Sequence, residues 1–460
     1  MNFEFSDEQQ AIQKLVREFA EKEIAPTVQE RDEKAEFSRE IFDKIGELGL
    51  CGIFFPEEYG GSDGSYVSYI LANEELSKVD DAVAAGYASS ISLCAWPIWK
   101  FGTEEQKKKY LTPLAEGTKL GAFGLTEPNA GSDAARQQST AVRKGDHYIL
   151  NGSKIFITNG GEADIYVVFA MTDKTKGTKG ISAFILEKGM EGFTFGKEEQ
   201  KMGIHASKTR ELIFQDVKVP EKIFSVKEGK GFQKSLWQGH RWRPYRCCMP
   251  RGLGIAGAAL EAAIKYSKER EQFGKPVCKF QSISFMLADM ATKLDAARLL
   301  VYRAAALKEQ GKPCTKESCM AKLYATDAAM SIATDAVQIL GGYGYIREYP
   351  VERLMRDAKI TQIYEGTNQI QRLIISGQLF TVNRSYRKGD TMSDVLTYDE
   401  MKVGDKTTFG KTIGECDVYA FAGVTGDFNP MHVNEVEASK TMFKGRIAMA
   451  CSVPASSPRP

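Results

Sequence analysis

IYEGTNQIQR, residues 363–372, is the stretch from which the organisation of this chain can be worked out. It places one carboxylate, Glu365, between an aromatic residue and a glycine, after a helical pattern that begins near Thr315. An acidic residue there suits the start of a helix, since the positive end of the helix dipole stabilises it. A carboxylate beside a glycine also suits a catalytic base, and motifs elsewhere in the chain decide between the two interpretations.

The composition is that of an ordinary globular protein. The 460 residues are enough for two to four domains, and the chain is 43% hydrophobic and 26% charged with a net charge of +1. A nearly neutral chain attracts neither nucleic acid nor an anionic membrane, so neither is expected as a partner. No secretion signal is evident and no apolar run reaches the roughly 18 residues of a membrane span, so a soluble, cytoplasmic protein is expected.

Cysteine and histidine usage indicates neither disulfides nor a metal. Nine cysteines occur without CxxC pairs, and there are four histidines. A disulfide framework or a zinc site requires paired spacings that are missing here, so no metal is expected. The thiols are expected to be reduced and to lie in apolar faces.

The residue pattern changes from helix to strand and back to helix along the chain. Residues 1–120 show helical spacing of apolar side chains after a capping sequence at Ser6. Residues 121–228 contain four strand-like runs separated by Asn-Gly and Gly-Gly turns, which predict a small β-domain. The runs are HYILNGSKIFITN, ADIYVVFAMT, GISAFILEK and ELIFQDVKV. Residues 229–381 return to helical spacing, with four long helices ending near Phe380.

Four further motifs accompany Glu365. They are GLTEPNAGSDA (residues 124–134), FITNGG (156–161), REQFGKP (270–276) and QILGGYGY (338–345). In this order the motifs resemble the acyl-CoA dehydrogenase family, most of all its bacterial butyryl-CoA (short-chain) members. The resemblance runs from about Phe3 to about Leu379. It implies an α+β fold class, with an all-α N-terminal domain, a small β-barrel middle domain and a C-terminal four-helix bundle.

Removing two hydrogens from a saturated acyl thioester requires a base and an electron acceptor. The α-carbon is a weak acid, so the base must lie against it where the thioester carbonyl is polarised. No side chain accepts a hydride, so a cofactor is required. Glu365 matches the glutamate of the family's Tyr-Glu-Gly-Thr motif, which implies that it takes the α-proton while N5 of FAD takes the β-hydride. The implied substrate-binding residues are Ser132, Tyr364 and Gly366.

The other motif residues match FAD contacts of the family. The implied set is Leu125, Thr126, Phe156, Thr158, Arg270, Gln272, Phe273, Gln338, Gly341, Gly342, Thr367 and Gln369. Phe156 replaces the family's tryptophan, which keeps stacking and loses an N–H donor. The segment around Arg270 is implied to reach the FAD pyrophosphate across a subunit interface, where an arginine fork suits a diphosphate. Without the resemblance, residues 131–132 are a backbone turn and residues 270–273 a solvated helix end.

A Rossmann-type nucleotide site is not expected. No GxGxxG motif follows a strand-like run anywhere in the chain. The flavin is therefore held in another way, and a nicotinamide-dependent dehydrogenase is not predicted.

One window departs from the family. Residues 236–252 read LWQGHRWRPYRCCMPRG, where the family has a Gly-Gly-Arg-Ile-Gly motif that opens a helix. Pro244 and Pro250 would each break that helix at a cost of about 3 kcal/mol. A local shift of reading frame in the coding DNA would explain the window, and resequencing tests this. No functional residue is assigned to it.

The tail resembles another family. After a polar linker at residues 382–393, residues 394–460 resemble the opening half of MaoC-like hydratases, which have a hot-dog fold and act on enoyl-CoA. Asp427 and His432 match the pair that activates water there; without the resemblance they are a turn residue and a surface histidine. The segment is too short for a complete hot-dog core, so an inactive, marginally ordered appendage is expected.

The sequence therefore predicts an FAD-dependent enzyme that converts butyryl-CoA to crotonyl-CoA. Family resemblance further implies a homotetramer that passes electrons to an electron-transferring flavoprotein. Three alternatives stay open: an acyl-CoA oxidase that uses oxygen, a non-catalytic CoA-thioester binder if residues 236–252 are real, and a fused dehydrogenase and enoyl-CoA hydratase.

Overall fold

The computed structural model describes residues 4–220 and 248–380, and these fall within one compact unit of the chain. The linker and tail predicted over residues 382–460, with Asp427 and His432, lie outside the described residues, as does most of the unusual window. None of the helices in the described ranges combines the length and apolar composition that crossing a membrane requires.

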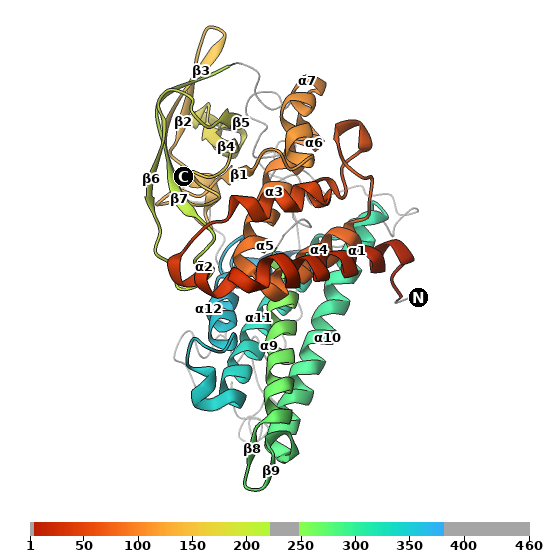
Figure 1. Cartoon of the computed structure of the whole chain (residues 1–460). Coiled ribbons are helices and arrows are strands. Elements are labelled where there is room, and N and C mark those ends of the chain that lie inside the picture. The colour runs from red at the N-terminus through yellow and green to blue at the C-terminus, as the bar shows by residue number, and fades with distance from the viewer. Residues whose placement is uncertain (1–3, 221–247, 381–460) are drawn as a thin grey trace, which may run out of the picture. The chain divides into compact units, whose positions relative to one another are not determined.

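The first part of the structure is helical, as predicted (Figure 1). Its helices, in which η marks 3-10 and π forms, are α1 (Asp7–Phe19), η1 (Ala20–Ile24), η2 (Ala25–Thr27), α2 (Val28–Lys34), α3 (Arg39–Glu47), η3 (Leu50–Gly52), η4 (Glu57–Tyr59), α4 (Tyr66–Val79), α5 (Asp81–Ala88), η5 (Ser89–Ala95), α6 (Trp96–Phe101), α7 (Glu104–Gln106), η6 (Lys107–Leu111) and α8 (Thr112–Ala115). Ser6 caps α1 through the predicted capping box with Gln9. Helices α4 and α5 are buried along nearly their whole length and form the centre of this part.

The middle of the chain forms a mixed sheet. Its strands are β1 (Gly121–Gly124), β2 (Thr140–Lys144), β3 (His147–Thr158), β4 (Ile165–Met171), β5 (Ile181–Glu187), β6 (Phe193–Glu198) and β7 (Thr209–Pro220), with short 3-10 helices η7 (Ala134–Arg136) and η8 (Lys174–Gly180) between strands. The order is β1-β4-β2-β3-β7-β6, and β5 pairs with β4. The four predicted runs form β3, β4, β5 and β7; the other three strands are short and lack a strong apolar pattern.

The last part is a helical bundle. Its elements are α9 (Cys248–Glu269), β8 (Glu271–Gln272), β9 (Lys275–Pro276), η11 (Val277–Lys279), α10 (Gln281–Glu309), α11 (Thr315–Leu340), η12 (Gly341–Gly344), α12 (Val351–Thr361) and α13 (Asn368–Phe380). Three helices are long, and two shorter ones, α12 and α13, take the place of the fourth. Positive φ angles at Glu365 (55°) and Gly366 (88°) interrupt that helix. Pro250 does not break α9, contrary to expectation, because it lies in the first turn, where backbone N–H groups have no helical partner.

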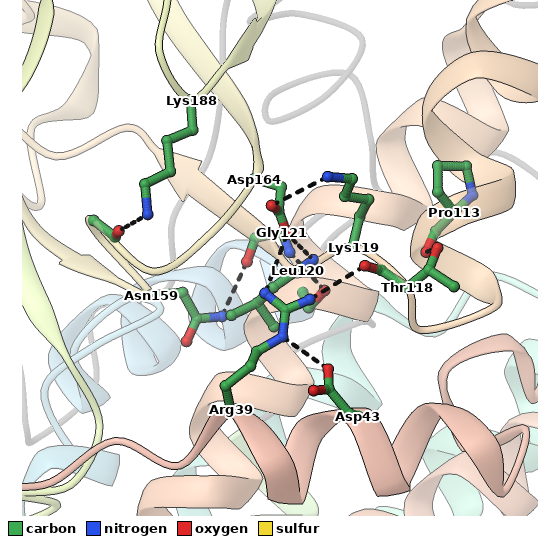
Figure 2. Close-up of polar contacts among 12 residues, drawn as sticks. Arg39, Asp43, Pro113, Thr118, Lys119, Leu120, Gly121, Asn159, Asp164 and Lys188 are labelled. Atoms are coloured by element: carbon green, nitrogen blue, oxygen red, sulfur yellow. Dashed lines mark hydrogen bonds and ion pairs between the residues drawn. The ribbon is translucent and has the colours of Figure 1, made fainter.

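Asp164 joins the sheet to the N-terminal helices (Figure 2). Its carboxylate accepts a hydrogen bond from the Leu120 backbone N–H at 2.9 Å, just before β1. Arg39 of α3 and Lys119 form ion pairs with the same carboxylate at 3.3 and 3.4 Å. Because β1 and β4 pair in parallel, this contact sets where both strands begin.

Candidate active site

Glu365 lies on the loop between α12 and α13, residues 362–367, which we call the base loop. Its φ of 55° is uncommon for a residue with a side chain and marks a conformation that the surroundings must hold in place. The carboxylate oxygen Oε2 is shielded from solvent. The residue as a whole is half-buried, so the shielding applies to this one oxygen of the carboxylate.

Both ends of the base loop are attached to α11. Asp327 accepts hydrogen bonds from the side-chain amides of Gln362 and Asn368, each at 2.7 Å. The fully buried Lys322 donates to the Asn368 side chain at 2.6 Å. The Asn368 backbone N–H then donates to the Gln362 carbonyl at 3.0 Å and closes the loop. These contacts hold the backbone on both sides of Glu365 and so restrict where the carboxylate can lie.

The other residues predicted around the base occupy the base loop and the start of α13. Gly366 has a φ of 88°, which glycine adopts without strain, and its carbonyl accepts from Gln371 at 2.8 Å. The Thr367 hydroxyl accepts from the Ile370 backbone N–H at 3.3 Å and caps α13. Gln369 is exposed on the first turn of α13.

Tyr364 contacts a residue that sequence analysis did not assign. The guanidinium carbon of Arg251 lies 5.1 Å from the centroid of the Tyr364 ring, a cation–π distance. Arg251 is buried in the first turn of α9 and forms a salt bridge with Asp81 of α5. It belongs to the part of the unusual window that the structure describes. The only sequence signal for it was a cation in the first turn of a helix, where the dipole disfavours one.

Four residues predicted to contact the flavin ring lie together where β1 ends beside β3. The Ile155 backbone N–H donates to the Thr126 carbonyl at 2.8 Å, which brings the two segments side by side. Leu125, Thr126 and Thr158 are half-buried. Phe156 has a φ of 59° and is 62% exposed, so its ring is available to a molecule outside this chain. Ser132, predicted to bind substrate, is exposed in the turn that follows.

A buried ion pair between Lys154 and Glu127 contacts the segment that follows β1. Lys154 of β3 is fully buried, and its ammonium donates to Glu127 at 2.6 Å, Gln137 at 3.1 Å and the Leu125 carbonyl at 3.3 Å. Burial lowers the pKa of Lys154 to about 8, although Glu127 opposes the change. Burial acts to raise the pKa of Glu127, but the ammonium and two backbone donors, one of them Ser139, bring it below its ordinary value. Both groups are therefore charged at neutral pH.

Asn159 of the FITNGG motif connects the sheet to α5. Its side-chain amide donates to the carbonyls of Gly86 and Gly121, each at 2.9 Å, and the contact with Gly121 is drawn in Figure 2. The residue is fully buried with a φ of 62°, a conformation that asparagine tolerates better than most residues. Asn159 is thus a structural member of the motif, and it holds Thr158 at a defined distance from β1.

The remaining predicted FAD contacts lie at the other end of the bundle. They are Arg270, Gln272, Phe273, Gln338, Gly341 and Gly342. The Arg270 guanidinium carbon is 5.4 Å from the Tyr343 ring centroid, so the end of α9 and the η12 turn meet. The β8–β9 hairpin lies away from the sheet, at the far end of α9 (Figure 1). Helix α9 has 22 residues, or about 33 Å, so one chain does not bring Arg270 to its own base loop.

The distal end of the bundle, formed by the β8–β9 hairpin and the η12 turn, exposes side chains and glycines that a ligand could contact. Phe273, at the hairpin tip, is 92% exposed. A side chain added at Gly342 would meet no atom of the chain within 4 Å, and Gly342 has no positive φ, so the chain itself does not require glycine there. A glycine there leaves room for the close approach of an external group. Exposed aromatics, open glycines and an arginine fork fit the chemistry of a flavin dinucleotide.

Helix α12 is anchored to the middle domain by Asp357. This residue is 2% exposed and accepts a hydrogen bond from the Ile204 backbone N–H. Burial raises its pKa to about 7, against a lowering by Arg353. The ordinary value is about 3.9, so between about pH 4 and pH 7 the folded chain keeps a proton that the unfolded chain has lost. The contribution of Asp357 to stability is therefore complete below pH 4 and is lost as the pH rises through 7.

Asp357→Asn should remove this pH dependence while keeping an oxygen that accepts from Ile204. The difference in unfolding free energy, variant minus wild type, is expected to increase by roughly 2–3 kcal/mol from pH 5 to pH 8. Denaturant unfolding of both proteins at the two pH values measures the difference, in which other titrating groups cancel. An equal difference at both pH values would contradict the assignment.

Comparison with known proteins identifies the domains. Residues 6–118, 122–217 and 229–380 match the N-terminal, middle and C-terminal domains of acyl-CoA dehydrogenase, and residues 399–458 match a MaoC like domain. The short-chain specific acyl-CoA dehydrogenase of Megasphaera elsdenii is 58% identical over 82% of this chain and 100% of its own length. The short-chain specific acyl-CoA dehydrogenase of Clostridium acetobutylicum is 54% identical over 83% of this chain and 100% of its own.

Solved structures agree with these relatives. The structure of butyryl-CoA dehydrogenase from Megasphaera elsdenii matches with a TM-score of 0.80 at 58% identity, over 82% of this chain and 100% of that one. A chain in a structure of the electron transferring flavoprotein of Acidaminococcus fermentans matches with a TM-score of 0.81 at 60% identity, over 83% of this chain and 100% of that one.

These matches define the class of protein as a flavoprotein oxidoreductase that acts on acyl-CoA. The chain belongs to the acyl-CoA dehydrogenase family. Members of this family are FAD-dependent enzymes, so the predicted fold class, enzyme class and cofactor are confirmed, together with the MaoC-like character of the tail.

Proposed function

We propose that this enzyme oxidises short-chain acyl-CoA, butyryl-CoA to crotonyl-CoA, with Glu365 as the base. The observation that carries the proposal is the Glu365 carboxylate, one oxygen of which is shielded from solvent, on a loop whose two ends are tied to α11. The short-chain preference is supported by the 58% identity to the short-chain specific relative from Megasphaera elsdenii.

In the proposed reaction Glu365 removes the α-proton of the thioester. The ties of Gln362 and Asn368 to Asp327 hold the backbone on both sides of Glu365, so the loop needs little ordering when substrate binds. Gly366 adds no side chain beside the carboxylate and leaves room for the substrate. Bound FAD supplies the acceptor for the β-hydride, and the residues at the end of β1 and at Phe156 would hold its ring. The proton stays on Glu365 until product leaves.

We further propose that the active enzyme is a homotetramer that passes its electrons to an electron-transferring flavoprotein. The separation of Arg270 from the base loop along α9 supports a site completed by a second copy of the chain. The match to a chain from the Acidaminococcus fermentans electron transferring flavoprotein structure supports the redox partner.

The test is to add butyryl-CoA to purified protein without oxygen and follow the visible flavin absorbance. A yellow protein that is bleached by butyryl-CoA, and that reduces a dye or an electron-transferring flavoprotein, is the expected result. A colourless protein that binds CoA thioesters without turnover would instead favour the non-catalytic binder. Stoichiometric peroxide in air would favour the oxidase.

A further inference from the structure

The base loop contacts a buried cation, Arg251, that has no role in the proposed reaction. Arg251, in the first turn of α9, covers the ring of Tyr364, the residue before Glu365. We propose that Arg251 is a positioning residue, which holds Tyr364 and thereby orients the Glu365 carboxylate for proton removal. The inference rests on the proposed function of Glu365 and on Arg251 being read in frame, which resequencing of the coding DNA for residues 236–252 tests.

Asp81 fixes the Arg251 side chain. Arg251 Nε donates to Asp81 Oδ1 at 2.8 Å, and Nη2 donates to Oδ2. The side chains are 1% and 0% exposed. A two-pronged contact of this kind fixes the plane of the guanidinium as well as its position. Since Asp81 is the first residue of α5, the contact ties the base loop through Arg251 to the buried centre of the N-terminal helices.

Stability alone does not account for this pair. A cation in the first turn of α9 lies at the positive end of the helix dipole, which disfavours it. Burying two charges carries a desolvation penalty that an apolar pair of similar volume would avoid, often without loss of stability. What an apolar pair could not supply is a cation held over the Tyr364 ring, 5.1 Å from its centroid, an attraction that strengthens where water is excluded.

A second buried pair next to the first provides a matched control. Arg31 donates to Asp80 at 2.6 Å, and the two side chains are 6% and 4% exposed. The other hydrogen bonds of Arg31 go to Thr27 and Ile24 in the N-terminal helices. The two pairs share their chemistry and their burial, and their aspartates are adjacent in the chain, but the cation–π contact with the base loop is made by Arg251.

The experiment replaces each pair by a neutral one of similar shape. Asp81→Asn with Arg251→Gln should keep the fold and the bound FAD, lower kcat for butyryl-CoA about tenfold and leave KM within about twofold. Asp80→Asn with Arg31→Gln should leave kcat within about twofold. Arg251→Lys, which keeps a charge over the ring but loses the two-pronged contact, should recover part of kcat. Melting temperature and FAD content are measured on every variant.

Two outcomes overturn the proposal. One is an unchanged kcat in the variant that combines Asp81→Asn with Arg251→Gln, called the 81/251 variant. The other is an equal loss of kcat in this variant and in the control that combines Asp80→Asn with Arg31→Gln. Should the 81/251 variant fail to fold, Arg251→Lys decides, because a lowered kcat at unchanged KM supports the proposal and an unchanged kcat refutes it. A wild-type chain that does not oxidise butyryl-CoA contradicts the proposed function as well, whereas active variants of an active wild type contradict only the role of Arg251.

Discussion

Glu365→Gln is expected to reduce the turnover of butyryl-CoA by about 10²- to 10⁴-fold, the usual contribution of a positioned general base. Glutamine has the shape of glutamate and can hydrogen bond, but it cannot accept the α-proton. The ties that hold the base loop run through Gln362, Asn368 and Asp327 and do not depend on the charge of residue 365. The variant should therefore fold, bind FAD and bind substrate like wild type.

The measurement compares kcat, the rate of flavin bleaching and the Kd of butyryl-CoA in the two proteins. Glu261→Gln serves as control, because this glutamate lies on the surface of α9 and pairs with Lys78, a contact worth less than about 1 kcal/mol. Retained turnover in Glu365→Gln would remove the proposed base. Loss of FAD along with turnover would show instead that the carboxylate supports the structure of the site.

Elements with a strong residue pattern were predictable, and weakly patterned ones were not. The runs that became β3, β4, β5 and β7 carry consecutive Ile, Val, Phe or Tyr, which a buried strand requires. Strand β1 is the four-residue GAFG, and its place in the sheet is set by its partner β4 through long-range pairing. The break between α12 and α13 was hidden, since apolar spacing continues on both sides, whereas the backbone leaves the helix over residues 362–367 and has positive φ at residues 365 and 366.

In the candidate site, too, some residues could be predicted from sequence motifs and others could not. Motif order singled out residues that the structure places on the base loop, at the end of β1 and in the η12 turn. It did not reveal the polar residues that support them, because their partners are remote in sequence: Asp327 lies 35 residues from Gln362, and Arg251 lies 170 from Asp81. Nor could spacing show that Arg270 follows the end of α9, whereas the base loop lies at the start of the same helix, where Arg251 contacts Tyr364. That separation follows from the length of α9, and it is the observation that supports the proposed site shared between two copies of the chain.

Lys154→Met is expected to lower the free energy of unfolding by about 3–5 kcal/mol, because it leaves the Glu127 carboxylate buried without its counter-charge. Lys154 is fully buried, and its ammonium bonds to three oxygens, one of them the Leu125 carbonyl. Two backbone N–H groups still donate to Glu127 in the variant, but they do not replace a full positive charge. The end of β1 should loosen, and FAD affinity should fall with it.

Denaturant unfolding with and without added FAD, together with the flavin content after gel filtration, measures both effects. Lys109→Met is the matched control, because its salt bridge to Glu187 is exposed and should contribute less than about 1 kcal/mol. Adding Glu127→Gln to Lys154→Met removes the stranded charge and should recover most of the stability. If the double variant recovers stability but does not bind FAD, the ion pair orients the segment at Leu125 and Thr126 that is proposed to hold the flavin ring. Wild-type stability and FAD content in Lys154→Met alone would refute both roles.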